Sequence, residues 1–382
     1  MNTAARKQEF SPESVLYMAI ELSANKWKLG FTIGLGQKLR ERTLEARDLK
    51  GLEEAIARAK SRFKLAEDTP VLCCFEAGRD GFWIDRYLKK IGVTNLVVDP
   101  GSIEGNRRWR KRKTDRLDLC TLLRCLVKWH WGDKKVWSVV NVPSEAAEDA
   151  RHLHRELEAL KKERTRHIAR IKGLLFGQGI QLLKVGDAFP RYLEVVRRWD
   201  GSPLDPMLMA RLKREYERFS VVGQQIKDLE VLRRKAIRES PNPVIQQIRH
   251  LMQLRGIGEN GAWLIVMELF AWREFQNRRQ VGSIAGFTPT PWISGGIGRE
   301  QGIDKAGNRR VRAMMIELAW GWLRYQPDSA LSIWFAQRFA GGGKRTRRIG
   351  IVAVARRLLI ALWRFLIDGV VPQGAVVATP SR

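Results

Sequence analysis

Short apolar stretches and amphipathic segments alternate along the first hundred residues. Three β-prone stretches come first, at 15–22, 26–34 and around 39–46. Their close spacing predicts an antiparallel meander. Apolar residues then recur with helical spacing at 51–63, and a second helical segment covers 80–92. Continuous apolar runs at 71–78 and 94–101 predict two buried parallel strands.

The order of these elements is strand, strand, strand, helix, strand, helix, strand. This order predicts an α/β domain with a mixed sheet and helices on both faces, which is the layout of the RNase H-like fold. In such a sheet the first and fourth strands are neighbours. A helix is expected next at 115–131, and we place the domain at residues 1–132.

The rest of the chain has the pattern of a helical protein. Two long charged helices, at 143–179 and 205–240, are joined by a connection that contains Pro and Gly. They predict an antiparallel coiled-coil arm over 143–240 that makes dimers or extends a nucleic-acid platform. Three histidines are expected at the surface of this arm: His152, His154 and His167. A mainly helical domain is expected at 244–370, followed by a disordered tail at 371–382.

The net charge changes this picture. The chain carries 69 Lys and Arg against 41 Asp and Glu, a formal charge of +28. Residues 1–100 hold 17 basic and 14 acidic residues, so almost all of the excess lies after residue 100. Like charge on this scale indicates a polyanionic partner, and nucleic acid is favoured over an anionic membrane.

Membrane, secreted and disulfide-rich classes are excluded by three features. Arg356, Arg357 and Arg364 interrupt the most apolar late stretch, which predicts a basic amphipathic helix and no membrane span. The N-terminus lacks the apolar core of a secretory signal. The four cysteines, Cys73, Cys74, Cys120 and Cys125, have neither disulfide-framework nor zinc-site spacing. We therefore expect reduced thiols and a cytoplasmic protein.

Four carboxylates are candidates for a metal site. Glu21 and Glu76 end the first and fourth strands, and Asp115 and Asp118 share a face at the start of the next helix. If that helix packs across the strand ends, the four groups meet, and such hard oxygen ligands favour Mg²⁺ or Mn²⁺. The alternative is a set of solvated strand-end and helix-start acids. Seven basic residues between 107 and 116 favour the metal site.

Ser294 is a candidate nucleophile. It lies in a Pro- and Gly-rich loop before Gly295 and Gly296, where small neighbours allow a phosphodiester to approach its hydroxyl. Arg309 and Arg310 follow and can hold non-bridging phosphate oxygens. By spacing alone, an ordinary flexible-loop serine is the stronger alternative.

Further nucleic-acid contacts are expected at three places. A G-x-G turn at Gly256 and Gly258 opens a helix whose backbone N–H groups can hold a phosphate, although plain helix packing competes. The segment 341–348 is expected to be a flexible basic loop. The candidate basic residues are Arg107, Arg108, Arg110, Lys111, Arg112, Lys113, Lys344, Arg345, Arg347 and Arg348.

Together these motifs resemble the DEDD transposases of insertion-sequence family 110, the RNA-guided serine recombinases. The N-terminal motifs are AIELSANKWKLG, CCFEAGRDG and VVDPGSIEGNRRWRKRKTDRLD, which ends in K-T-D-x-x-D. The C-terminal motifs are LRGIGENGA, IAGFTPTPWISGG and IDKAGNRRVRAMMIELAW, which contain S-G-G and K-x-G-N-R. The resemblance covers about residues 15–368, and the motifs are specific in this order.

The resemblance implies a RuvC-like metal tetrad of Glu21, Glu76, Asp115 and Asp118. It also implies that Ser294 forms a covalent phosphoserine link with DNA. The protein would act as a dimer or tetramer in the bacterial or archaeal cytosol, with active sites that combine the RuvC-like domain of one chain with the serine domain of another. Its partners would be double-stranded donor and target DNA and a structured non-coding guide RNA, with no membrane. Base pairing would then select the sequence.

Two positions depart from the family pattern. The first acid is usually Asp, and Glu21 places the carboxylate one methylene further out. Position 293 is Ile where family members often carry another Ser, so Ser294 is the only serine in the loop. Two other functions stay open, namely a RuvC-like structure-specific nuclease that uses metal-activated water and a catalytically inactive nucleic-acid-binding protein.

Overall fold

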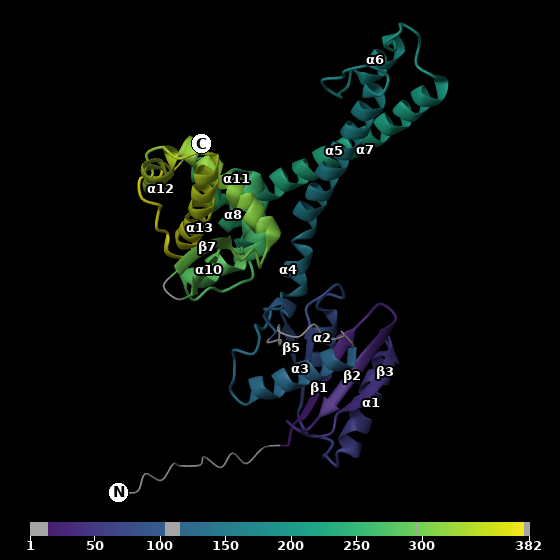
Figure 1. Ribbon diagram of the computed structural model, residues 1–382, viewed down its shortest axis with the longest axis vertical. Helices are drawn as coiled ribbons and strands as arrows, with labels where there is room; N and C mark the ends of the chain where they lie inside the picture. Colours follow the sequence, from purple (N-terminus) through teal and green to yellow (C-terminus); the bar gives the residue numbers. More distant parts are fainter. Residues whose placement is uncertain (1–13, 104–114, 295–296, 378–382) are drawn as a thin grey trace. The chain divides into compact units, whose positions relative to one another are not determined.

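The computed structural model describes residues 14–103, 115–294 and 297–377 (Figure 1). The chain forms two compact units, Met1–Pro143 and Ser144–Arg382. The basic segment that contains Arg107 to Lys113 lies outside the described residues. The predicted arm and C-terminal domain both fall in the second unit, and the boundaries proposed between them stay a prediction.

The first unit is built on a five-stranded sheet. Its elements are β1 (Leu16–Leu22), β2 (Lys26–Thr32), β3 (Arg40–Glu45), α1 (Leu49–Arg62), β4 (Val71–Glu76), α2 (Trp83–Lys90), β5 (Thr94–Val98), η1 (Pro100–Ser102) and α3 (Asp115–His130). The strand order is β3-β2-β1-β4-β5. The first three strands pair antiparallel, whereas β1 with β4 and β4 with β5 pair parallel. The predicted α/β class, element order and β1–β4 adjacency are confirmed.

Residues of β1 and β4 alternate between two apolar layers. Met18 pairs with Cys73, and both are buried in the layer that α1 and α2 cover. Ala19 pairs with Cys74, and both are buried in the layer that α3 covers. Because side chains of a strand point to opposite faces in turn, every second residue belongs to the α3 face.

The second unit begins with a long antiparallel helical pair. Its elements are α4 (Glu145–Asp149), α5 (His152–Phe176), α6 (Phe189–Val195) and α7 (Pro206–Glu239). Leu160 in the first half of α5 packs with Ile226 of α7, and Leu175 near its end packs with Leu212. The predicted antiparallel pair is therefore present. A single helix over 143–179 is wrong, because a turn at residues 150–151 separates α4 from α5.

Two of the three histidines expected at the arm surface are buried, so that prediction is wrong. His154 is 5% exposed and His167 is 3% exposed. His167 Nδ1 lies 2.7 Å from Glu215 Oε1 on the paired helix, and His154 Nε2 lies 2.9 Å from Glu268 Oε1. The apolar stripe of the arm gave no sign of these polar partners, since they are 48 and 114 residues away in the chain.

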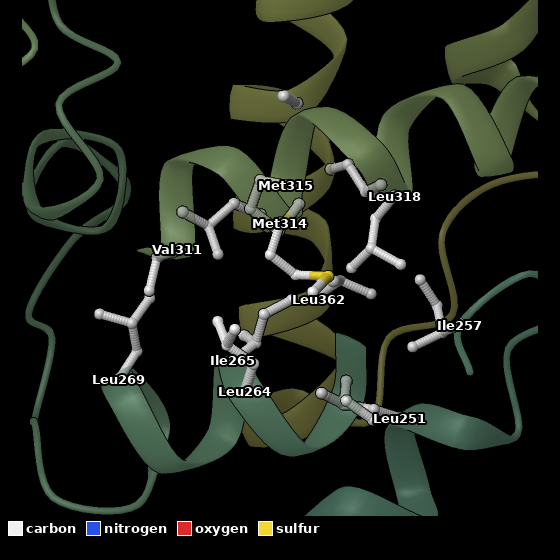
Figure 2. Close-up of a cluster of buried hydrophobic side chains, with 14 of the residues drawn as sticks. Leu251, Ile257, Leu264, Ile265, Leu269, Val311, Met314, Met315, Leu318 and Leu362 are labelled. Atoms are coloured by element: carbon white, nitrogen blue, oxygen red, sulfur yellow. The ribbon is translucent and has the colours of Figure 1, made fainter. Parts of the chain in front are cut away.

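The remaining elements of the second unit form a mainly helical region. They are α8 (Pro243–Met252), α9 (Glu259–Ile265), the π-helical turn η2 (Val266–Phe270), α10 (Arg278–Ile284), β6 (Pro289–Ser294), β7 (Ile297–Ile303), α11 (Arg309–Tyr325), α12 (Ala330–Phe335), the π-helical turn η3 (Ala336–Ala340) and α13 (Lys344–Asp368). In this region α13 packs against α8, α10, α11, α12 and η3. Figure 2 shows Leu264 and Leu269 on the side of their segment that faces Val311 and Met314 of α11, with Leu362 of α13 beside them. Among the described helices, none has the length and apolar character that crossing a membrane requires.

Part of the C-terminal tail is held by a buried amide. Gln326 is 1% exposed, and its Nε2 donates to the carbonyl oxygens of Arg255 (2.8 Å) and Val376 (2.9 Å). The backbone N–H of Val376 donates in return to Gln326 Oε1 at 2.8 Å. The prediction of a disordered tail is therefore wrong for 371–377, and residues 378–382 lie outside the described part of the chain.

Replacing this amide tests how the tail is held. Gln326→Met keeps the length of the side chain but removes its hydrogen bonds to the Arg255 carbonyl and to the N–H and carbonyl of Val376, of which the Val376 carbonyl keeps the N–H of Arg255. We expect this to lower the free energy of unfolding by about 1–3 kcal/mol. The exposed Gln337→Met is the matched control and stays within about 0.5 kcal/mol of the wild type. Urea unfolding of both full-length variants gives the comparison, and equal stability of the two would refute the assigned role.

Candidate active site

Two candidate metal ligands lie at the carboxyl end of the central parallel strands. Glu21 is the next-to-last residue of β1, and Glu76 is the last residue of β4. Each comes two residues after Ala19 or Cys74, which are register partners on the α3 face. Because side chains of a strand alternate between faces, both glutamates therefore belong to the face of the sheet that α3 covers.

Helix α3 runs antiparallel to these strands and brings its N-terminal end to the two glutamates. Tyr17 at the start of β1 shares a hydrogen bond of 2.7 Å between its Oη and Nδ1 of His130, the last residue of α3. Nearer the glutamates, the Cys74 thiol donates to the carbonyl oxygen of Leu122 at 3.9 Å. Moving along the strands toward their carboxyl ends thus means moving along α3 toward its first turn.

Asp115 and Asp118 belong to this N-terminal end of α3. Asp115 is its first residue, and its side chain lies outside the described part of the structure. Among the described side chains, no group of three or more His, Cys, Asp and Glu could hold a metal ion. Carboxylate oxygens are the donors that Mg²⁺ and Mn²⁺ take, so the residue types of the four candidates fit such an ion.

Ser294 ends a β-strand, so its assignment to a loop is wrong. It is the last residue of β6 and pairs with Ile297 of β7 in an antiparallel hairpin. The ladder is irregular between Pro289 and Pro291, as expected where prolines supply no N–H. The side chain of Ser294 and the two following glycines lie outside the described residues.

The base of this hairpin is a close contact between two backbone segments. Gly286 and Gly307 have φ of +69° and +111°. A Cβ at Gly286 would lie 2.3 Å from the carbonyl oxygen of Ala306, and one at Gly307 would lie 2.4 Å from that of Ile284. Only glycine combines such a φ with this approach, so the G in K-x-G-N-R has a structural cause.

Asn308 of the same motif links the hairpin to a helix start and to a buried acid. Its Oδ1 accepts from the backbone N–H groups of Arg310 (2.9 Å) and Val311 (3.2 Å), which caps α11. Its Nδ2 donates to Glu268 Oε2 at 2.9 Å. The orientation of the α11 N-terminus is thus set by a residue of η2.

Glu268 is the centre of a buried polar network. Its side chain is 1% exposed, and the guanidinium of Arg155 donates to both carboxylate oxygens at 2.8 and 3.0 Å. His154 completes the set from the same helix, α5. Burial alone would raise the pKa of Glu268, but hydrogen bonds from His154 and Arg155, the Arg155 charge and the Asn308 amide hold that pKa well below its usual range.

Several predicted phosphate contacts lie at helix starts. Arg309 and Arg310 are the first residues of α11, and Arg310 Nε also donates to Glu158 Oε2 at 2.7 Å. The expected flexible loop at 341–348 is wrong in part, because α13 begins at Lys344. The four basic residues Lys344, Arg345, Arg347 and Arg348 thus occupy its first turns.

The G-x-G turn has the predicted form. Gly256 has φ +92°, and Gly258 is the N-cap of α9. Binding of a phosphate at this turn stays a prediction.

The comparison with known proteins assigns the family. A family model described as "Transposase IS116/IS110/IS902 family" matches residues 248–332, from α8 to α12. The chain is 41% identical over an alignment of 384 residues to "Putative transposase y4rJ" of Sinorhizobium fredii, covering 96% of this chain and 95% of that protein. The chain belongs to the IS116/IS110/IS902 transposase family.

Two further transposases are similar over much of their length. The transposase for insertion sequence element IS1328 of Yersinia enterocolitica is 26% identical, over 70% of this chain and 75% of that protein. The transposase for IS1533 of Leptospira borgpetersenii is 27% identical, over 62% and 66%. The region that the family model matches contains Ser294, the Gly286–Gly307 contact and the Asn308 cap.

Sequence reasoning missed Glu268, His154 and Asn308 as parts of this site. Asn308 carried a usable signal, because an Asn directly before a helical apolar pattern is typical of an N-cap. Glu268 carried none, since it lies in an apolar run and its partners are distant in the chain.

Neutralising Glu268 tests the network. Glu268→Gln removes the carboxylate that Arg155 and His154 contact, and we expect a loss of about 2–3 kcal/mol in the free energy of unfolding at pH 7. Because the folded-state pKa lies below the unfolded value of about 4.3, this difference is complete above that pH and shrinks as the pH falls below it.

Urea unfolding of the wild type and the variant between pH 7 and pH 3 measures this difference. The exposed Glu274→Gln is the control and changes stability little. A Glu268→Gln effect that stays constant down to pH 3 would contradict the assigned charge state.

Proposed function

We propose that this transposase cleaves and exchanges DNA strands in a Mg²⁺-dependent, RNA-guided reaction that passes through a phosphoserine at Ser294. The main support is the position of Ser294 within the matched transposase region, at the end of a strand whose base is fixed by the Gly286–Gly307 contact. A nucleophile on a rigid element is held in a reactive geometry better than one on a mobile loop.

The serine step is a balanced exchange of esters. Ser294 Oγ attacks the phosphorus of a DNA phosphodiester, and the bond from phosphorus to the 3′ oxygen breaks. The serine hydroxyl loses its proton, and the leaving 3′ oxygen takes up a proton to become a 3′ hydroxyl. A 3′ hydroxyl of the other duplex then attacks the phosphoserine, which restores both the phosphodiester and the serine. Each step conserves one phosphate ester, so no nucleotide hydrolysis is required.

Arg309 and Arg310 would hold the non-bridging oxygens of the phosphate. They open α11, whose first turn Asn308 caps, and both are exposed. A guanidinium forms paired charge-assisted hydrogen bonds with phosphate oxygens. Because Arg310 is also bonded to Glu158 of α5, the arm helix would take part in aiming this side chain.

The first unit would contribute the metal ligands. Its sheet order supports an RNase H-like fold of the RuvC type, and Glu21, Glu76, Asp115 and Asp118 would hold Mg²⁺ or Mn²⁺. The bound metal would supply positive charge that stabilises the phosphate in the transition state. The chain's own residues would set the number of donors and would bring the four carboxylates to one end of the sheet.

The excess positive charge supports polyanionic partners. We assign these as donor and target duplex DNA and a structured guide RNA, bound by a homodimer or tetramer. The charge of +28 fits several nucleic-acid segments bound at once, and the α5–α7 pair offers a helical surface for a second subunit.

Formation of a covalent adduct tests the proposal. Full-length protein with its co-purified RNA is incubated with Mg²⁺ and end-labelled duplexes that carry the element's flanking DNA, and the products are run on a denaturing gel. We expect a slow, protease-sensitive band for the wild type and for Ser283→Ala, and its complete loss for Ser294→Ala.

The outcomes separate two reaction classes. An adduct that persists in Ser294→Ala would exclude this nucleophile. Cleavage without an adduct in either protein would instead support a nuclease in which metal-activated water attacks. Ser283 is a suitable control because it is an exposed serine of α10 in the same matched region.

A further inference from the structure

A basic cleft of about 1450 Å³ lies in the second unit beside α13. Its walls come from α10, α12 with η3, and α13 from Lys344 to Arg364; α10, α12 and α13 are labelled in Figure 1. The base of the Ser294 hairpin closes one side, because the paired residues Pro289 and Ile303 line the cleft. None of the sequence motifs pointed to this cavity as a whole.

Every charged residue among the described lining residues of the cleft is basic. Nine of its described lining residues are Arg or Lys, and no carboxylate is among them. Six of the nine come from α13: Lys344, Arg345, Arg348, Arg356, Arg357 and Arg364. Arg278 and Arg279 face them from α10, and Arg338 from η3. Within the described part of the chain none of these nine cations forms an ion pair, so a bound polyanion would neutralise them.

The floor of the cleft is apolar and aromatic. The rings of Trp334 and Phe339 meet edge to face, with centroids 5.3 Å apart. The guanidinium of Arg357 lies 3.9 Å above the Trp334 ring. Ile349 and Val352 extend the apolar surface along α13. The side chains between the cations thus present mainly π faces and methyl groups.

We propose that this cleft binds a single-stranded segment of nucleic acid, with phosphates at the basic rim and unstacked bases against Trp334 and Phe339. A basic groove with aromatic side chains is the arrangement that single strands use, because every base offers a π face. A duplex would meet the rim with its phosphates and leave the apolar floor empty. The bound strand is therefore a melted DNA strand or an unpaired RNA segment, which share this chemistry.

The position of the cleft relative to the hairpin gives it a role. Pro289 and Ile303 at the hairpin base line the cleft, and Ser294 is five residues further along β6, a span of roughly 17 Å in an extended strand. A strand held in the cleft would thus leave it at the hairpin that carries the nucleophile. This role rests on the proposed function, whereas strand binding does not.

Neutralising two rim arginines tests the proposal in the full-length protein. Arg348→Gln combined with Arg357→Gln removes two exposed cations. We expect binding of a labelled 12-nucleotide oligo-dT or oligo-U to weaken at least tenfold. The slope of log affinity against log salt should fall by about 1.4, which corresponds to two phosphate contacts on a single strand. Fluorescence anisotropy at several salt concentrations measures both quantities.

The control removes the same charge elsewhere in the second unit. Arg211→Gln combined with Arg214→Gln removes two exposed arginines from α7. We expect less than a twofold loss of single-strand affinity for this control. The cleft variant should lose less affinity for a 12-base-pair duplex than for the single strand, because a duplex contacts the basic rim but not the aromatic floor. An equal loss in both variants, or an equal loss for duplex and single strand, would overturn the proposal.

A cross-link locates the bases independently of charge. Oligonucleotides with 5-iodouracil, in DNA and RNA form, are irradiated with the protein, and the modified peptide is identified by mass spectrometry. Attachment at Trp334 or Phe339 by either form supports the proposal, and the form that reacts identifies the strand. Attachment only outside the cleft would overturn it.

The same proteins separate this inference from the serine mechanism. Ser294→Ala should bind and cross-link the single strand like the wild type. If the wild type binds the single strand but forms no adduct, the serine mechanism is refuted and single-strand binding in the cleft is retained. If the Arg348→Gln, Arg357→Gln variant forms the adduct normally and its single-strand affinity is unchanged, strand binding in the cleft is refuted and the serine mechanism is retained.

Discussion

The arrangement of the second unit depends on the hydrogen bonds that the buried carboxylate of Glu268 accepts. It accepts from Arg155 and His154 of α5 and from Asn308 at the start of α11, so one side chain joins the arm, the π-helical turn η2 and the end of the hairpin region. A buried charge of this kind costs much in desolvation unless every lone pair is used. Its main effect is on geometry, because hydrogen bonds to all three segments fix their positions relative to one another.

For the proposed phosphoryl transfer, a protein has to supply mainly position and charge, and the two units would supply them by different means. The second unit fixes a strand end by backbone contact at two glycines and a helix start by an asparagine cap. The first unit uses the alternation of its parallel strands to put two glutamates on the face of α3. In both cases local rules of strands and helices place the polar groups, and the apolar cores keep them there.

Much of the fold follows from the sequence because its periodicity is local. The apolar runs at 71–78 and 94–101 contain the parallel strands β4 and β5, and the apolar stripes of the two arm helices pack against each other as predicted. The errors have long-range causes. The buried histidines and the ordered tail depend on partners far along the chain, and the prolines at 289 and 291 hid a strand. Family motifs named Ser294 and Gly307, but only the structure explains why that glycine is required.

We infer that Glu268 and Asn308 act as one unit in fixing the start of α11. A double-mutant cycle in the free energy of unfolding, with Glu268→Gln, Asn308→Ala and the combined variant at pH 7, tests it most directly. Residues in one buried network show coupling of about 0.5–3 kcal/mol, and we predict at least about 1 kcal/mol here. Additive effects within about 0.3 kcal/mol would contradict the account, because the two side chains would then stabilise the protein independently.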